Sequence, residues 1–331
     1  MTTESATATL SPSLGGKRRG VLDRVGDRAL YLITLLAAIG SVVILGGLTY
    51  KVVDLASGAI SNNGLGFITT SNWDPVHGQF GAAQFLYGTA VSSFGALLLA
   101  TPLSIAIALF LTELAPRGTR TPIATLVELL AGIPSVILGL WGILVLAPLM
   151  QSTVEPALHS ALGWIPVIGK LFAGAYSPVG LFPAMVILTI MTVPIVSSLT
   201  REIFTTVPPA AKEGALALGG TRWEMIKTVV LPYSRPGIVA AVMLGLGRAV
   251  GEAIAVSQVI GGAPSIGSNL FLPAQSAAGQ IAAQYQGGTP DTQSALAYLA
   301  VILLVLSLVF TGVARLLVRA IQQRSEGRSQ A

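Results

Sequence analysis

Long apolar runs dominate the chain, and short polar stretches separate them. Six runs are long enough to be helices that span a membrane: roughly 29–50, 84–112, 123–150, 179–204, 236–262 and 295–320. A helix rises about 1.5 Å per residue, so about 20 apolar residues cross a hydrocarbon core of about 30 Å. Barrel strands would instead alternate polar and apolar positions over about 9–11 residues. The pattern therefore predicts an all-α polytopic membrane protein with six transmembrane helices.

The composition agrees with a membrane protein and limits the other classes. Hydrophobic residues make up 53% of the 331 and charged residues 10%, whereas about 25% of a soluble domain is charged. Cysteine is absent, which excludes disulfides and thiolate metal sites. No phosphate-binding loop of the form G-x4-G-K-[ST] occurs, and His77 and His159 have no obvious carboxylate partner. We therefore expect a chain that is not an enzyme and holds no metal or cofactor of its own.

The basic residues predict the orientation. If the N-terminus is cytoplasmic, all but three of the 19 lysines and arginines fall in cytoplasmic segments, the exceptions being Lys51, Lys170 and Arg248. Cytoplasmic segments carry an excess of positive residues, so we expect both termini inside. The expected organisation is a disordered cytoplasmic tail, an anchor helix, an extracytoplasmic loop, a membrane domain and a second cytoplasmic tail, at 1–28, 29–50, 51–83, 84–320 and 321–331 respectively.

Aromatic residues cluster around the predicted extracytoplasmic loop. Trp73, Phe80 and Phe85 lie close to the start of the second apolar run. Aromatic side chains often gather where a membrane meets water. We therefore interpret these three rings as an interface belt at the level of the lipid headgroups.

Three of the charged residues within the predicted spans are candidates for a role: Glu128, Arg248 and Glu252. A charge near a helix centre costs at least about 2.5–3.5 kcal/mol on insertion scales, so it is rarely without a role. Arg248 and Glu252 are four residues apart and would share one face of a helix. They form either an internal ion pair between helices or an anion pathway, because arginine offers a planar fork of donors to an oxyanion. Glu128 has either a structural or a pathway role. Small residues near the pair would let other backbones approach closely: Gly245, Gly247 and Gly251.

The segment 213–232 is polar and charged, and it lies between two apolar runs. It reads EGALALGGTRWEMIKTVVLP and fits the spacing E-A-A-x3-G-x9-I-x-L-P, with Gly214 in place of one alanine and Val229 in place of isoleucine. This spacing resembles the coupling loop of ABC-importer permeases, which docks onto a separate ATPase. We call 205–235 the coupling loop and expect a short helix over roughly 209–220. The residues assigned to ATPase coupling are Glu213, Gly214, Ala215, Gly219, Leu231 and Pro232, of which the last two would end the next helical piece.

Four further segments make the resemblance more specific. They are ELLAGIPSVILGLWG at 128–142, GLGRAVGEAIAV at 245–256, WDP at 73–75 and FGAAQFLYGT at 80–89. With the coupling loop, they are similar to the PstC family of permease subunits from bacterial phosphate ABC importers, over about residues 30 to 320. The resemblance implies a type I ABC-importer permease fold in the bacterial cytoplasmic membrane. It also implies that Arg248 and Glu252 take part in the passage of phosphate.

The resemblance implies partners as well. They are a sister permease like PstA, two copies of an ATPase like PstB that would bind ATP and Mg, and an extracytoplasmic phosphate-binding protein like PstS. Three alternatives stay open: the sister phosphate permease, a permease for another oxyanion such as sulfate or molybdate, and a self-contained secondary transporter. The last would leave the segment 213–232 unexplained.

Overall fold

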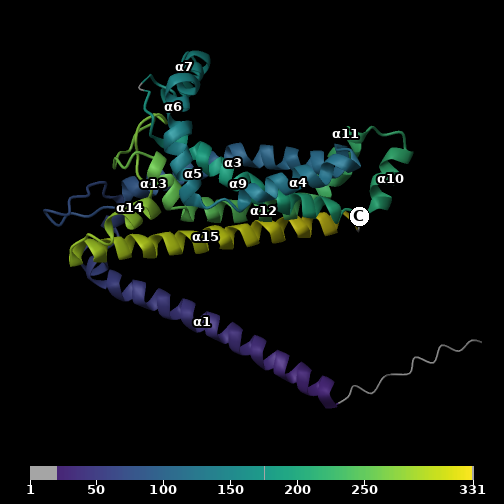
Figure 1. The fold of residues 1–331 in the computed structure, drawn as a ribbon, viewed down its shortest axis with the longest axis horizontal. Coiled ribbons are helices and arrows are strands. Elements are labelled where there is room, and N and C mark those ends of the chain that lie inside the picture. The colour runs from purple at the N-terminus through teal and green to yellow at the C-terminus, as the bar shows by residue number, and fades with distance from the viewer. Residues whose placement is uncertain (1–20, 175, 330–331) are drawn as a thin grey trace, which may run out of the picture. The chain divides into compact units, whose positions relative to one another are not determined.

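A computed structural model describes residues 21–174 and 176–329, and these fold almost entirely into helices (Figure 1). The extended pairings among them are two isolated bridges, Asp74 with Gln79 and Gly261 with Ala274. Helices that are long and apolar enough to cross a membrane number six within this part of the chain: Gly26–Asn63, Ala83–Leu114, Ser135–Leu162, Leu181–Thr205, Arg222–Gly251 and Pro290–Ala320. The prediction of an all-α fold with six such helices is confirmed.

The chain forms two compact units, 1–51 and 52–331, and every helix after α1 belongs to the second. The helices, with π-helical segments written η, are α1 (Val21–Asn63), α2 (Gly66–Thr69), α3 (Ala83–Leu109), η1 (Phe110–Leu114), α4 (Arg117–Ala131), α5 (Ser135–Trp141), η2 (Gly142–Leu146), α6 (Ala147–Leu149), η3 (Met150–Val154), α7 (Glu155–Leu162), α8 (Ile168–Leu171), α9 (Leu181–Thr205), α10 (Pro209–Ala217), α11 (Arg222–Met225), η4 (Ile226–Val230), α12 (Leu231–Gly251), α13 (Ile254–Val259), α14 (Ala277–Gln284) and α15 (Pro290–Ser329).

The two terminal helices are longer than the sequence predicts. α1 begins at Val21, inside the segment 1–28, and continues to Asn63, inside the predicted loop 51–83. α15 continues to Ser329, through most of the segment 321–331. The rest of the two predicted tails, 1–20 and 330–331, lies outside the described residues. Hydropathy marks where a helix enters lipid, but it does not mark where the helix ends in water.

The third predicted span, 123–150, is two helices. α4 ends at Ala131 and α5 begins at Ser135. Pro134 has no N–H and restricts the residue before it, so the helix cannot continue through this point. α4 packs on α9, whereas α5 and η2 pack on α13 (Figure 1). The long apolar helix at this position therefore starts after the proline and runs to Leu162.

The aromatic residues of the 51–83 region lie in a core. Trp73 contacts Phe80 and Phe85 edge to face, with ring centroids 5.1 Å apart in both pairs. The Trp73 indole N–H donates to Gln284 Oε1 at 3.0 Å, and Phe85 is fully buried. The interface-belt interpretation is wrong, because these rings pack on one another and on α14.

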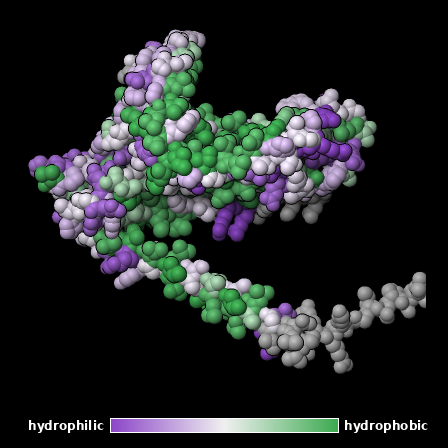
Figure 2. Space-filling model, viewed as in Figure 1, coloured by the Kyte–Doolittle hydropathy of each residue, from purple (hydrophilic) through white to green (hydrophobic). Residues whose placement is uncertain are grey.

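The second unit is held together by contacts among α3, α9, α12 and α15. One buried cluster joins the coupling loop to the end of α3, and it comprises Ala108, Phe204, Val207, Met225, Ile226 and Val230. Apolar side chains cover much of the visible face of this unit, and hydrophilic ones gather over α10 and α11 (Figure 2). The coupling loop thus exposes polar side chains at α10 and α11, while its buried apolar side chains pack against the ends of α3 and α9.

Candidate functional site

A groove of about 870 Å³ opens between α9, α12 and α15. It brings Arg248 and Glu252 together, as predicted. Its other polar lining residues come from α15, and its remaining walls are apolar or glycine. These α15 residues are Thr311, Arg315 and Arg319. The groove is therefore cationic, with three guanidinium groups and one carboxylate.

Arg248 and Glu252 are not paired, contrary to one of the two predicted arrangements. α12 ends at Gly251, and Glu252 has extended backbone angles (φ −73°, ψ 117°), so the two residues do not share a helix face. The Glu252 Oε1 atom accepts a hydrogen bond from the Ala255 N–H at 3.3 Å instead. Because its carboxylate faces the start of α13, Glu252 does not neutralise Arg248. The groove keeps an exposed cation.

The glycines of α12 divide into two kinds. A Cβ on Gly245 would meet Val196 at 2.7 Å and Thr192 at 2.8 Å, so this glycine allows α9 to approach closely. A Cβ on Gly247 or Gly251 would meet nothing within 4 Å. Close helix packing explains Gly245, whereas the other two glycines face open space in the groove.

Glu128 belongs to a different site. Its carboxylate makes an ion pair with Arg201 of α9, which fixes α4 against that helix. The pair is half exposed and lines a separate cavity of about 560 Å³. Of the two roles left open for Glu128, the contacts favour the structural one. The sequence did not indicate the partner, because Arg201 is 73 residues away in the chain.

The coupling loop contains the predicted short helix, α10, and Gly219 explains how it ends. The Gly219 N–H donates to Leu216 O at 3.0 Å, and the Gly220 N–H donates to Ala215 O at 3.2 Å. Gly219 has φ +85°, a left-handed conformation that favours glycine. This is a Schellman motif, which satisfies the last carbonyls of a helix. Along α10, Glu213 and Gly214 are exposed and Ala215 is half-buried.

The expectation that Leu231 and Pro232 end a helix is wrong. Helical structure is continuous from Arg222 to Gly251, and these two residues lie where η4 passes into α12. The Leu231 N–H donates to Ile226 O, five residues back. Pro232 has no N–H to donate. The wider π turn ends just before it, so Pro232 lies in the first turn of α12, where a missing N–H is tolerated.

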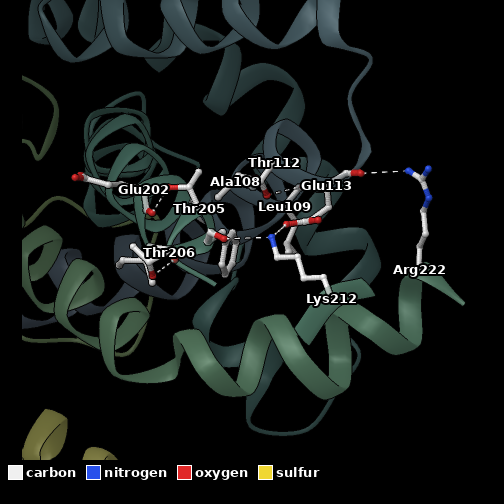
Figure 3. A network of polar contacts seen from close by, with 11 residues as sticks. Ala108, Leu109, Thr112, Glu113, Glu202, Thr205, Thr206, Lys212 and Arg222 are labelled. Atoms are coloured by element: carbon white, nitrogen blue, oxygen red, sulfur yellow. Dashed lines mark hydrogen bonds and ion pairs between the residues drawn. The ribbon is translucent and has the colours of Figure 1, made fainter. Parts of the chain in front are cut away.

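A partly buried ion pair fastens the coupling loop to the second long helix (Figure 3). The Lys212 Nζ atom lies 2.6 Å from Glu113 Oε1, and the two side chains are 20% and 10% exposed. Lys212 also donates to Phe204 O at 3.4 Å, and Arg222 donates to Glu113 O at 3.3 Å. Glu113 therefore holds both α10 and the start of α11. The sequence analysis missed Glu113, whose only signal was a carboxylate at the end of an apolar run.

Comparison with known proteins identifies the family. Residues 100–323 match the family of binding-protein-dependent transport system inner membrane components. The chain belongs to this family. Proteins named phosphate transport system permease protein PstC are similar along most of its length. The one from Mesorhizobium japonicum is 42% identical, covering 97% of this chain and 99% of the relative, and the one from Pasteurella multocida is 40% identical, covering 91% of each.

Solved structures agree on the fold of this permease. A chain of a bacterial ABC transporter involved in the import of alginate, an acidic polysaccharide, has a TM-score of 0.58 at 20% identity, over 91% of this chain and 98% of that one. The MetNI methionine ABC transporter, in an inward-facing conformation, has a TM-score of 0.52 at 21% identity, over 75% of this chain and 95% of that one. The predicted fold of a type I ABC-importer permease is confirmed, and the chain is a multi-pass membrane protein of the PstC family.

Proposed function

We propose that this chain is a permease subunit that forms half of the pathway for inorganic phosphate in an ATP-driven importer of the bacterial cytoplasmic membrane. The observation that carries the proposal is its identity of 42% with a PstC protein along 97% of its length. A groove with an exposed arginine inside an apolar helix supports it, because a guanidinium fork suits a tetrahedral oxyanion. Both termini would be cytoplasmic, as the distribution of basic residues favours.

The proposed assembly has four kinds of subunit. This chain would pair with a sister permease like PstA, which would supply the other half of the pathway. Two ATPase subunits like PstB would bind ATP and Mg, since this chain has no phosphate-binding loop. An extracytoplasmic protein like PstS would deliver phosphate. The match to a family of binding-protein-dependent components supports the last of these partners.

The coupling loop would transmit the work of ATP hydrolysis. α10 offers a short exposed helix with Glu213 and Gly214 on its surface. When the two ATPases close, α10 would move with them, and α9 and α12 would follow because they flank the loop. Packed helices favour a few discrete arrangements, so such a movement switches the groove between two states. Arg248 and Glu252 would meet the anion in one or both of these states.

Reconstitution of the complex in proteoliposomes tests the proposal. Uptake of radioactive phosphate should need the loaded binding protein outside and ATP inside. Excess sulfate or molybdate should not compete. Uptake without ATP would favour a secondary transporter, and competition by another oxyanion would reassign the substrate.

A reversed charge tests the coupling assignment separately. Glu213→Lys should leave the complex assembled but reduce the phosphate imported for each ATP hydrolysed, because the Glu213 side chain is exposed and makes no hydrogen bond or ion pair with the described residues. Glu202→Lys is the matched control, since Glu202 is exposed at the end of α9, outside the coupling motif. Equal transport by wild type and Glu213→Lys would contradict the assignment.

A further inference from the structure

Two further arginines, Arg315 and Arg319, line the groove beside Arg248. They are one helical turn apart on α15, and Thr311 lies one turn before them on the same stripe. Within the described residues, none of the three guanidinium groups has a hydrogen bond or an ion pair. The groove therefore holds three cations without partners and a single carboxylate, Glu252, that accepts a hydrogen bond elsewhere.

The three arginines form a series along the groove. α12 starts at the coupling loop and leads away from it, and α15 packs along α12 and runs in the opposite direction (Figure 1). Arg248 is near the far end of α12, and Arg315 and Arg319 lie progressively closer to the coupling loop. Four residues of helix rise about 6 Å, so neighbouring steps on α15 are about one oxyanion diameter apart.

The groove is open enough to hold a ligand. Gly247 and Gly251 form part of its wall, and an added Cβ at either would meet nothing within 4 Å. Its volume of about 870 Å³ leaves room for a hydrated anion. Unmatched cations in an apolar groove are costly, and an oxyanion would neutralise them while accepting their hydrogen bonds.

We propose that Arg315 and Arg319 form a second oxyanion-binding step, which takes inorganic phosphate from Arg248 on its way to the cytoplasm. This inference rests on the proposed phosphate import. A phospholipid headgroup offers the same phosphate chemistry. The transported anion fits better, because the two arginines share one groove with Arg248, which lies within an apolar helix.

Uptake by the reconstituted complex is the first test. Arg315→Gln/Arg319→Gln should lower the rate of phosphate uptake at least tenfold, because two charge-assisted contacts are lost. Arg315→Lys/Arg319→Lys should keep most of the rate, since the charge remains. Arg117→Gln is the matched control: Arg117 is also exposed, at the start of α4, but lies outside both the groove and the coupling loop, and uptake should be unchanged. Wild-type uptake by the double glutamine variant would overturn the inference.

Thiol labelling gives a second test that does not depend on transport. The chain has no cysteine, so Thr311→Cys places a single thiol in the groove. In nanodiscs of phosphatidylcholine, added phosphate should slow labelling of Cys by an anionic reagent, and this protection should vanish when both arginines are glutamine. Protection by phosphatidylglycerol but not by phosphate would identify a headgroup site and overturn the inference.

The two tests separate failure of the inference from failure of the proposed function. If the wild-type complex imports no phosphate, the proposed function fails, and labelling alone decides the inference. Protection of the Thr311→Cys thiol by phosphate would then still identify an oxyanion site at Arg315 and Arg319. Absence of protection would overturn that site. A double glutamine variant that does not assemble is judged by labelling of the double lysine variant, which should retain protection.

Discussion

Charged residues at the base of the coupling loop and in the groove have opposite surroundings. Lys212 and Glu113 are paired and mostly buried, and Arg222 donates to the backbone carbonyl of Glu113. In the groove, Arg248 and Arg315 are exposed and have no partner within the described residues. Both regions lie in one unit of about 280 residues and use the same residue types.

The difference separates two uses of charge. A buried pair contributes little net stability, but removal of one partner is costly, so such a pair fixes how two elements meet. An unpaired arginine beside an apolar wall fixes nothing within the chain and is available to a ligand. We therefore assign the Glu113–Lys212 pair to the transmission of movement and the groove arginines to the anion. Four predictions test this division.

The largest effect is expected at Arg248. Arg248→Gln should lower phosphate uptake about a hundredfold, because a guanidinium that makes two charge-assisted hydrogen bonds contributes roughly 1.5–3 kcal/mol with each. Assembly should be intact, since Arg248 has no partner among the residues that the structure describes and its loss leaves none of them unpaired. The measurements are uptake in proteoliposomes and the elution volume of the purified complex.

The double variant Arg248→Gln/Glu252→Gln is the control for folding. If the two residues formed an ion pair, the double variant would be more stable than the single one. We expect no such recovery, because the Glu252 carboxylate accepts from Ala255 and not from Arg248. Normal uptake by the double variant would remove both residues from the pathway.

The next effect concerns the end of α10. Gly219→Val should reduce uptake about tenfold, because residues other than glycine cost roughly 1–2 kcal/mol in the left-handed conformation. An added Cβ meets nothing within 4 Å, so the cost would come from the backbone and not from a clash. Gly219→Asn, which tolerates this conformation, should transport close to the wild-type rate. Equal rates for the two variants would mean that the end of the helix does not matter.

A smaller effect is expected at the paired charges. Lys212→Met should lower the free energy of unfolding by about 1–3 kcal/mol, less than for a fully buried pair because solvent screens these partly exposed groups. The double variant Glu113→Gln/Lys212→Met should recover most of this loss, since no carboxylate is left without its cation. Thermal unfolding of the purified complex measures both. If the single and double variants lost the same free energy of unfolding, Glu113 and Lys212 would not act as a pair.

The sequence predicts the spans well because hydropathy depends on residue type alone. It predicts the site less completely, because partners come from distant segments. Glu113 meets Lys212 across 99 residues, and Glu128 meets Arg201 across 73. Periodicity also assumed a helix through Glu252, whereas α12 stops one residue earlier. A short-range pattern indicates that an intramembrane charge matters, but only the fold shows whether it is paired.

One partner that the sequence analysis missed lies only three residues away in the chain. The sequence analysis left His77 without a carboxylate, yet Asp74 Oδ2 lies 2.5 Å from its Nδ1. Asp74 belongs to the WDP motif, which the sequence analysis used only for the family resemblance. Turn residues often bind side chains a few positions away, so the spacing of three contained this signal.

The smallest effect is expected at Asp74 and His77, which are paired without being buried: their side chains are 37% and 73% exposed. The hydrogen bond from the His77 side chain, with backbone N–H donors of His77 and Val76, holds the pKa of Asp74 below its ordinary value of 3.8. Because the pKa of Asp74 is lower in the folded chain, its ionised carboxylate stabilises the turn at pH values above the ordinary pKa. This stabilisation is lost as the pH falls through the folded-state pKa. Amide exchange over 74–79, compared with Asp74→Asn at each pH, should show protection in the wild type at pH 5 to 7 and a progressive loss of it as the pH falls below 3.8. Phosphate uptake near neutral pH should be almost unchanged in Asp74→Asn, because an exposed pair contributes little. A fall in the free energy of unfolding of Asp74→Asn as large as that of Lys212→Met would show that pairing matters without burial, and the division drawn between the two regions would need another basis.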